Sequence, residues 1–176
     1  MDLKSLIASA DSMPSYPVSD WYPERKASID ISIHKDGSWW HEGSVFERHK
    51  LVQLFSRLLA WREGRYWLVT PAEQLAIEVE DLPFIVVAAD LIDDTWQLTT
   101  NCGDTVALTK LDQLRVEIDQ VGAIPQIHIR DGLWANLSRQ AYFDLAMQVQ
   151  ERTQDGQLIG YLNSAGVEFP FGLLEA

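Results

Sequence analysis

An approximate internal repeat is the feature that most constrains how this chain of 176 residues folds. One order of elements occurs twice: a strand, an Asp-Gly turn, a strand with tryptophan, a serine, a helix, an acidic residue before glycine, and two strands. The matching segments lie 92–95 residues apart and are Lys35–Trp39 and Arg130–Trp134, Ser44 and Ser138, Glu63-Gly64 and Asp155-Gly156. The repeat predicts two related α+β units with an acidic run of strands between them.

Alternating hydrophobicity predicts that most of the chain forms short strands. Ile29, Ile31 and Ile33 alternate with polar residues, Asp36-Gly37 suits a tight turn, and residues 38–41 form the return strand. Further strands are expected at 66–70, 75–80, 84–89, 95–100, 106–110, 114–118, 158–162 and 167–171. The connections are short, and a parallel crossover needs about a dozen residues or more, so we expect a predominantly antiparallel meander sheet.

Two helices are predicted, one in each repeat. Ser44 and Glu47 have the spacing of a capping box, and an apolar stripe runs from there to about residue 61. The second helix is expected over about 139–152, with Ser138 in the capping position. Each helix is expected to stop at the acidic residue and glycine that follow it.

These elements divide the chain into three expected parts. Three prolines fall within residues 1–24, where we expect an extended arm. The first α+β repeat unit is expected over residues 25–83, and the second, with the meander strands, over residues 84–176. Hydrophobic residues make up 47% and charged residues 23% of the chain, values that fit a folded globular protein.

Charge and cysteine content restrict the classes of partner. The formal net charge of −12 disfavours nucleic acid and anionic membrane surfaces, because both carry negative charge. Acidic residues gather over residues 72–119, which contain 11 acids and two bases, so a basic protein partner is an alternative. No apolar run is long enough to span a membrane, and a single cysteine suits the cytoplasm, where we expect this protein.

No motif of a known catalytic or cofactor site is present. The sequence has no histidine four residues after His41, and it lacks a P-loop, the Gly-x-Gly-x-x-Gly pattern and the Gly-x-Ser-x-Gly elbow. One cysteine excludes a zinc-finger type of site. We therefore expect no cofactor or metal, and favour a binding protein over an enzyme.

Two arginines fall at helix starts, where a cation meets an unfavourable dipole. On a helical wheel Arg48 lies on the apolar side of the first helix, and Arg139 lies in the first turn of the second. A partly buried guanidinium needs a partner, because an unpaired buried charge is costly. The partner is either an internal carboxylate, such as Glu80, Asp81 or Asp131, or a bound anion.

A set of spaced motifs resembles the bacterial family called domain of unknown function 1285 (DUF1285). The resemblance extends from about Trp21 to Gly172. Its motifs are His41-x-Gly43, Leu68-x-Thr70-Pro71-x-Glu73, Val79-Glu80-Asp81-x-Pro83-Phe84, Thr100-Asn101-x-Gly103-Asp104, Ile129-Arg130-x-Gly132-Leu133 and Ala135-x-Leu137-x-Arg139. It implies a two-lobed α+β protein with repeated structural motifs and ligand binding connected with signalling. The polar positions that match are His41, Glu73, Glu80, Asp81, Asn101, Asp104, Arg130 and Arg139.

Three functions follow as hypotheses. The first is a module that binds a small anion or takes part in signalling, with a pocket between the two halves. Its expected ligand residues are His41, Arg48, Glu80, Asp81, Asn101, Arg130 and Arg139. The second is a metal-assisted hydrolase that uses Glu80 or Asp81 as a base. The third is an adaptor that contacts a protein partner through an acidic sheet face or a free strand edge.

Overall fold

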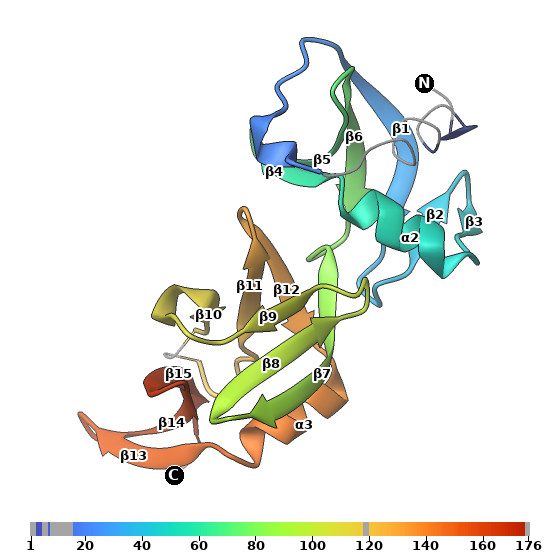
Figure 1. Ribbon diagram of the computed structural model, residues 1–176. Helices are drawn as coiled ribbons and strands as arrows, with labels where there is room; N and C mark the ends of the chain where they lie inside the picture. The colour runs from blue at the N-terminus through green and yellow to red at the C-terminus, as the bar shows by residue number, and fades with distance from the viewer. Residues whose placement is uncertain (1–2, 5–6, 8–15, 118–119, 175–176) are drawn as a thin grey trace. The chain divides into compact units, whose positions relative to one another are not determined.

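The fold is described from a computed structural model for residues 3–4, 7, 16–117 and 120–174 (Figure 1). Half of the expected N-terminal arm and the end of the strand expected at 114–118 lie outside these residues. Within the arm, a short 3-10 helix, η1 (Val18–Asp20), is followed by extended backbone at Trp21. In the described part, no helix is long and apolar enough to cross a membrane.

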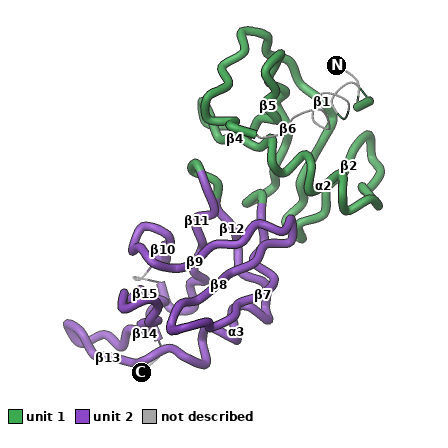
Figure 2. The backbone as a smooth tube through the Cα atoms, viewed as in Figure 1, with its two compact units in different colours: residues 1–83, 131–133 green, residues 84–130, 134–176 purple. Residues whose placement is uncertain are grey.

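Two compact units make up the chain (Figure 2). Unit 1 contains Met1–Pro83 together with Asp131–Leu133, and unit 2 contains Phe84–Arg130 and Trp134–Ala176. No sheet is shared between the strands before Pro83 and those after it. Each unit is therefore described by itself.

Unit 1 is a six-stranded sheet with one helix. Its elements are β1 (Lys26–Ile33), β2 (Trp39–His41), β3 (Ser44–Val45), α2 (His49–Ser56), β4 (Leu59–Arg62), β5 (Arg65–Val69) and β6 (Gln74–Val79). The strand order is β3-β2-β1-β6-β5-β4. The expected β1–β2 hairpin is confirmed, with Ile33 opposite Trp39. Ile31 and Ile33 are buried with Trp39 and Phe55, so the alternating pattern of β1 places its isoleucines in the core.

Unit 2 contains a six-stranded sheet, a three-stranded sheet and one helix. The elements of the first sheet are β7 (Phe84–Ile92), β8 (Thr95–Thr100), β9 (Thr105–Ala107), β10 (Leu114–Arg115), β11 (Gln126–Arg130) and β12 (Leu133–Leu137). A 3-10 turn, η2 (Leu111–Gln113), precedes β10. The helix and the smaller sheet are α3 (Arg139–Ala146), β13 (Gln150–Gln154), β14 (Gln157–Ser164) and β15 (Val167–Leu173). The orders are β10-β11-β12-β7-β8-β9 and β13-β14-β15.

The predicted fold class, an α+β protein with two repeated units and predominantly antiparallel sheets, is confirmed. A pair of strands, a helix and three strands follow one another from β1 to β6 and again from β11 to β15, and the first repeat has the additional short strand β3 before its helix. The pairing of the strands differs between the repeats. β1 lies parallel to β6, whereas β12 lies parallel to β7, and the last three strands form their own sheet.

Both helices are shorter than predicted, and the first begins later. Ser44 lies in β3, and the residue that precedes the first turn of α2 is Arg48, without a side-chain cap. The predicted capping box is therefore wrong. Leu59 is buried as expected, but in strand β4. In the second helix Ser138 does cap, because its hydroxyl accepts a hydrogen bond from Ala141 N at 3.1 Å.

The acidic residue and glycine after each helix form a hairpin turn and do not end the helix. Glu63 and Gly64 have φ angles of 54° and 74° and connect β4 to β5. Asp155 and Gly156, at 52° and 80°, connect β13 to β14. Two successive positive φ angles are the signature of a type I′ turn, whose twist matches paired strands. The residues just before these turns are consequently strand residues.

Candidate functional site

The seven expected ligand residues are divided between the two units. His41, Arg48, Glu80 and Asp81 belong to unit 1. Asn101, Arg130 and Arg139 belong to unit 2. The contacts of each group are therefore described within its own unit.

Arg48 lies at the start of α2, which has features of an anion site. Its backbone is extended, with φ −87° and ψ 98°, and its carbonyl accepts a hydrogen bond from Leu51 N at 2.9 Å. In the described part, no side chain caps this end of α2, and the first turn contains no acidic residue. Unfilled N–H groups and the helix dipole favour a negative charge at such an end.

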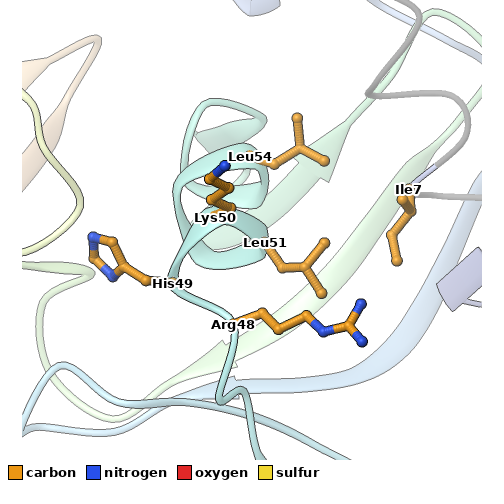
Figure 3. Close-up of a pocket in the computed structure, with 6 residues that line it drawn as sticks. All are labelled: Ile7, Arg48, His49, Lys50, Leu51 and Leu54. Atoms are coloured by element: carbon orange, nitrogen blue, oxygen red, sulfur yellow. The ribbon is translucent and has the colours of Figure 1, made fainter.

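A pocket of about 530 Å³ opens beside this helix end, and we name it the Arg48 pocket. Its lining residues are Ile7, Arg48, His49, Lys50, Leu51 and Leu54. Figure 3 shows the side chains of Arg48, Leu51 and Leu54 extending toward Ile7, whereas His49 extends to the other side of the helix. Cationic groups and aliphatic surface thus border the same space.

His41 does not line the Arg48 pocket. It ends β2, and its Nε2 lies 4.0 Å from Glu42 Oε1. Its ring centroid lies 6.0 Å from that of Phe46. It lines a separate hollow together with Lys4, Asp30 and Glu42, so a cation and two carboxylates border this hollow.

Glu80 holds the β1–β2 turn. Its Oε2 accepts a hydrogen bond from Lys35 N at 2.8 Å, and Nε2 of His34 lies 3.9 Å from its Oε1. Asp81 is exposed. Among the described residues no three His, Cys, Asp or Glu side chains come together as a metal site, so no observation favours the hydrolase alternative.

Asn101 and Arg130 both make structural contacts in unit 2. Asn101 Oδ1 accepts a hydrogen bond from Ile85 N at 3.0 Å, and Asn101 N donates to Ile85 O at 2.8 Å. The Arg130 guanidinium donates to Asp104 Oδ1 and lies 5.1 Å above the ring of Phe84. The half-buried Arg130 thus has an internal carboxylate partner, Asp104.

The expectation that Arg48 and Arg139 are partly buried is wrong. Both side chains are exposed, Arg48 at the start of α2 and Arg139 as the first residue of α3. Water solvates an exposed guanidinium, so neither arginine needs an internal carboxylate. The two arginines differ in their surroundings. Arg48 lines a pocket, whereas Arg139 lies at the start of α3, which Ser138 already caps.

The sequence analysis missed most of the Arg48 pocket. The basic run from Arg48 to Lys50 was visible in the sequence as part of an excess of bases over residues 44–65. Arg48 was expected within the first turns of the helix, whereas it lies just before the first turn, because the helix was predicted to begin earlier than His49. Ile7 had no signal, since only the fold brings it to α2.

The fold defines a class: an α+β protein of two repeated sheet–helix units. Residues 16–82 match the model "Domain of unknown function (DUF1285), N-terminal domain", and residues 83–171 match "Protein of unknown function (DUF1285), C-terminal domain". The chain therefore belongs to the DUF1285 family, as the sequence motifs predicted. No curated protein matches it.

Two solved structures are similar to the chain. A DUF1285 family protein from Silicibacter pomeroyi DSS-3 is 31% identical, with a TM-score of 0.79 over 94% of this chain and 93% of that chain. A DUF1285 family protein from Shewanella baltica OS155 is 24% identical, with a TM-score of 0.55 over 65% of this chain and 87% of that chain. The second similarity concerns the fold alone.

Proposed function

We propose that this protein binds a small amphipathic anion in the Arg48 pocket. The observation that carries the proposal is the lining of the pocket, in which Arg48 and Lys50 border the aliphatic side chains of Leu51 and Leu54. A carboxylate with a short alkyl chain fits both kinds of surface. The uncapped start of α2 adds N–H donors near the same cations.

The net charge of the chain restricts where an anion can bind. A formal net charge of −12 repels anions over most of the surface, so an anion needs a local excess of cations. The Arg48 pocket has such an excess, since none of the described residues that line it is acidic. Signalling, which the family resemblance implied, would require binding to alter a second surface, and our proposal is confined to the binding step.

The test is binding of octanoate to the full chain, measured by isothermal titration calorimetry and by thermal unfolding. Ligand that binds the folded state alone stabilises it, by about 2.7 kcal/mol at 100 times the Kd. Octylamine and octanol serve as probes with the same chain and a different head group. We expect octanoate to bind at least tenfold more tightly than either.

The matched variants are Arg48→Met and Arg57→Met. Both remove one exposed cation from α2, but Arg57 lies at the opposite end of the helix and does not line the pocket. Arg48→Met should weaken octanoate binding at least tenfold, and Arg57→Met should leave it unchanged. Equal affinities for octanoate and octanol, or equal effects of the two variants, would refute the proposal.

A further inference from the structure

A second pocket lies in unit 2, beside the short strand β10, and we name it the Arg115 pocket. Its volume is about 680 Å³. Its lining residues include Arg115, Glu117, Ile124, Gln126 and Asn136. None of them belongs to the Arg48 pocket or to the expected ligand residues, so this site is independent of the proposed function.

Two side chains, Gln126 and Trp134, contact the Arg115 guanidinium, and a third, Asn136, contacts Gln126. Gln126 lies opposite Arg115 in the β10–β11 ladder, and its Oε1 accepts a hydrogen bond from Arg115 Nε at 2.8 Å. The guanidinium lies 4.0 Å above the ring of Trp134. Gln126 Nε2 in turn donates to Asn136 Oδ1 at 3.4 Å, which fixes the orientation of the Gln126 amide. An arginine that already has these two contacts loses less side-chain entropy when it binds a ligand than a free one does.

The same contacts leave one edge of the guanidinium for a ligand. The Trp134 ring covers a face of the planar group, and Gln126 uses Nε. The two Nη groups, which make the fork that recognises carboxylates, make no ion pair with a described carboxylate. The pocket therefore offers donors in the geometry of a carboxylate.

A carboxylate alone does not suit this pocket, because Glu117 also lines it. The exposed Glu117 side chain makes no ion pair with a described residue. Its negative charge opposes an anion and favours a cation. Val116, Ala123 and Ile124 add aliphatic surface to the same lining. A ligand that satisfies all these groups carries a carboxylate, an ammonium group and an aliphatic part.

We propose that the Arg115 pocket binds a small zwitterion, of which an aliphatic amino acid is the simplest. Arg115 binds the carboxylate and Glu117 binds the ammonium group. The aliphatic lining receives the side chain. The volume of about 680 Å³ leaves room for it.

Three probes with one alkyl group test the proposal: L-valine, isovalerate without the ammonium group, and isobutylamine without the carboxylate. Their binding to the uniformly ¹⁵N-labelled full chain is followed by NMR. The indole N–H of Trp134 is the reporter, because Arg115 lies on its ring. We expect valine to shift this resonance and to bind at least tenfold more tightly than either other probe.

Variants separate the two charged contacts. Arg115→Met should abolish valine binding, while Arg152→Met, which removes an arginine from β13 in the same unit, should leave it unchanged. Glu117→Gln should let isovalerate bind as tightly as valine. If valine at about 20 mM does not shift the Trp134 indole resonance, the proposal is overturned. Equal binding of valine and isovalerate to the unmodified chain would also overturn it.

Discussion

Among single residues, Glu73 stands apart because it is a carboxylate without solvent exposure. Neither of its carboxylate oxygens accepts a hydrogen bond from a described group. Arg25 Nε lies 3.3 Å from Glu73 Oε2, and Gln74 N donates to Arg25 O at 3.0 Å. Arg25 therefore supplies the charge that offsets the burial of Glu73, at the start of β6.

Removing Arg25 tests this dependence. Arg25→Met leaves a buried carboxylate unpaired, so we expect the free energy of unfolding to fall by about 1–3 kcal/mol, toward the lower end because Arg25 is 68% exposed. Replacing Glu73 by Met in the same variant should recover the loss, because both charges are then gone. Urea unfolding measures the free energies of unfolding of the single and the double variant. A double variant less stable than Arg25→Met would contradict the prediction.

Glu168 gives a prediction for pH. Arg152 donates hydrogen bonds of 2.7 and 3.2 Å to its carboxylate, and these hold the pKa of Glu168 below its usual value. A lowered pKa in the folded state means that the pair contributes stability above the unfolded pKa and loses it as the pH falls through the folded pKa. Both side chains are exposed to solvent, so the contribution is small.

The measurement is an NMR titration of the carboxyl carbons. In Arg152→Gln the pKa of Glu168 should rise toward its usual value, since the main cause of the lowering is gone. The pKa of Asp36 is lowered chiefly by the Ser38 hydroxyl, so it should stay where it is. An unchanged pKa of Glu168 would show that the ion pair does not persist in solution.

At the scale of elements, the starts of the two helices give a matched pair of variants. Ser138 caps α3, whereas Ser44 lies in β3 and caps nothing. Ser138→Ala should lower the free energy of unfolding by about 1 kcal/mol, because the N–H of Ala141 loses its acceptor. Ser44→Ala should change it by less than about 0.5 kcal/mol. Thermal and urea unfolding compare the stabilities of the two variants. Equal losses of stability would mean that Ser44 also caps a helix.

The elements also show what local pattern could predict. The hydrophobic pattern located β5, β6, β8 and β14 to within two residues, and β1 to within three. Burial repeats every second residue in β8, whereas β5 and β6 bury consecutive residues. The ends of the helices were wrong, because an acidic residue before glycine suits both a helix stop and a hairpin turn. Leu58 and Leu59 continue the apolar spacing of α2 yet lie past its end, and burial alone does not distinguish the two structures.

For the whole molecule, the sheets suggest that the second unit folds by itself. Its two sheets use only strands from Phe84 onward, and its buried residues include Phe84, Leu98, Ala135 and Phe169. We predict that residues 84–176 alone give a dispersed ¹H–¹⁵N spectrum whose resonances largely overlay those of the same residues in the full chain. A collapsed spectrum, with the full chain well dispersed, would show that unit 2 depends on unit 1.

The candidate sites were harder to predict than the fold, for a reason that belongs to this scale. A strand or a turn depends on neighbouring residues, but a pocket joins residues from distant segments. Ile7 reaches α2, and Arg115 meets Gln126 and Trp134, only after the chain has folded. Helical spacing directed attention to Arg48, whereas nothing local singled out Arg115.

The parallel pairing of β1 with β6 has a consequence for synthesis. β1 occupies the middle of its sheet, and its neighbour β6 follows β2 to β5 in the sequence. As the chain leaves the ribosome, β1 pairs first with β2, and its other edge stays open until β6 emerges. A contact between such distant segments closes slowly. Until β6 pairs with β1, the nascent chain exposes the open edge of a central strand to other chains.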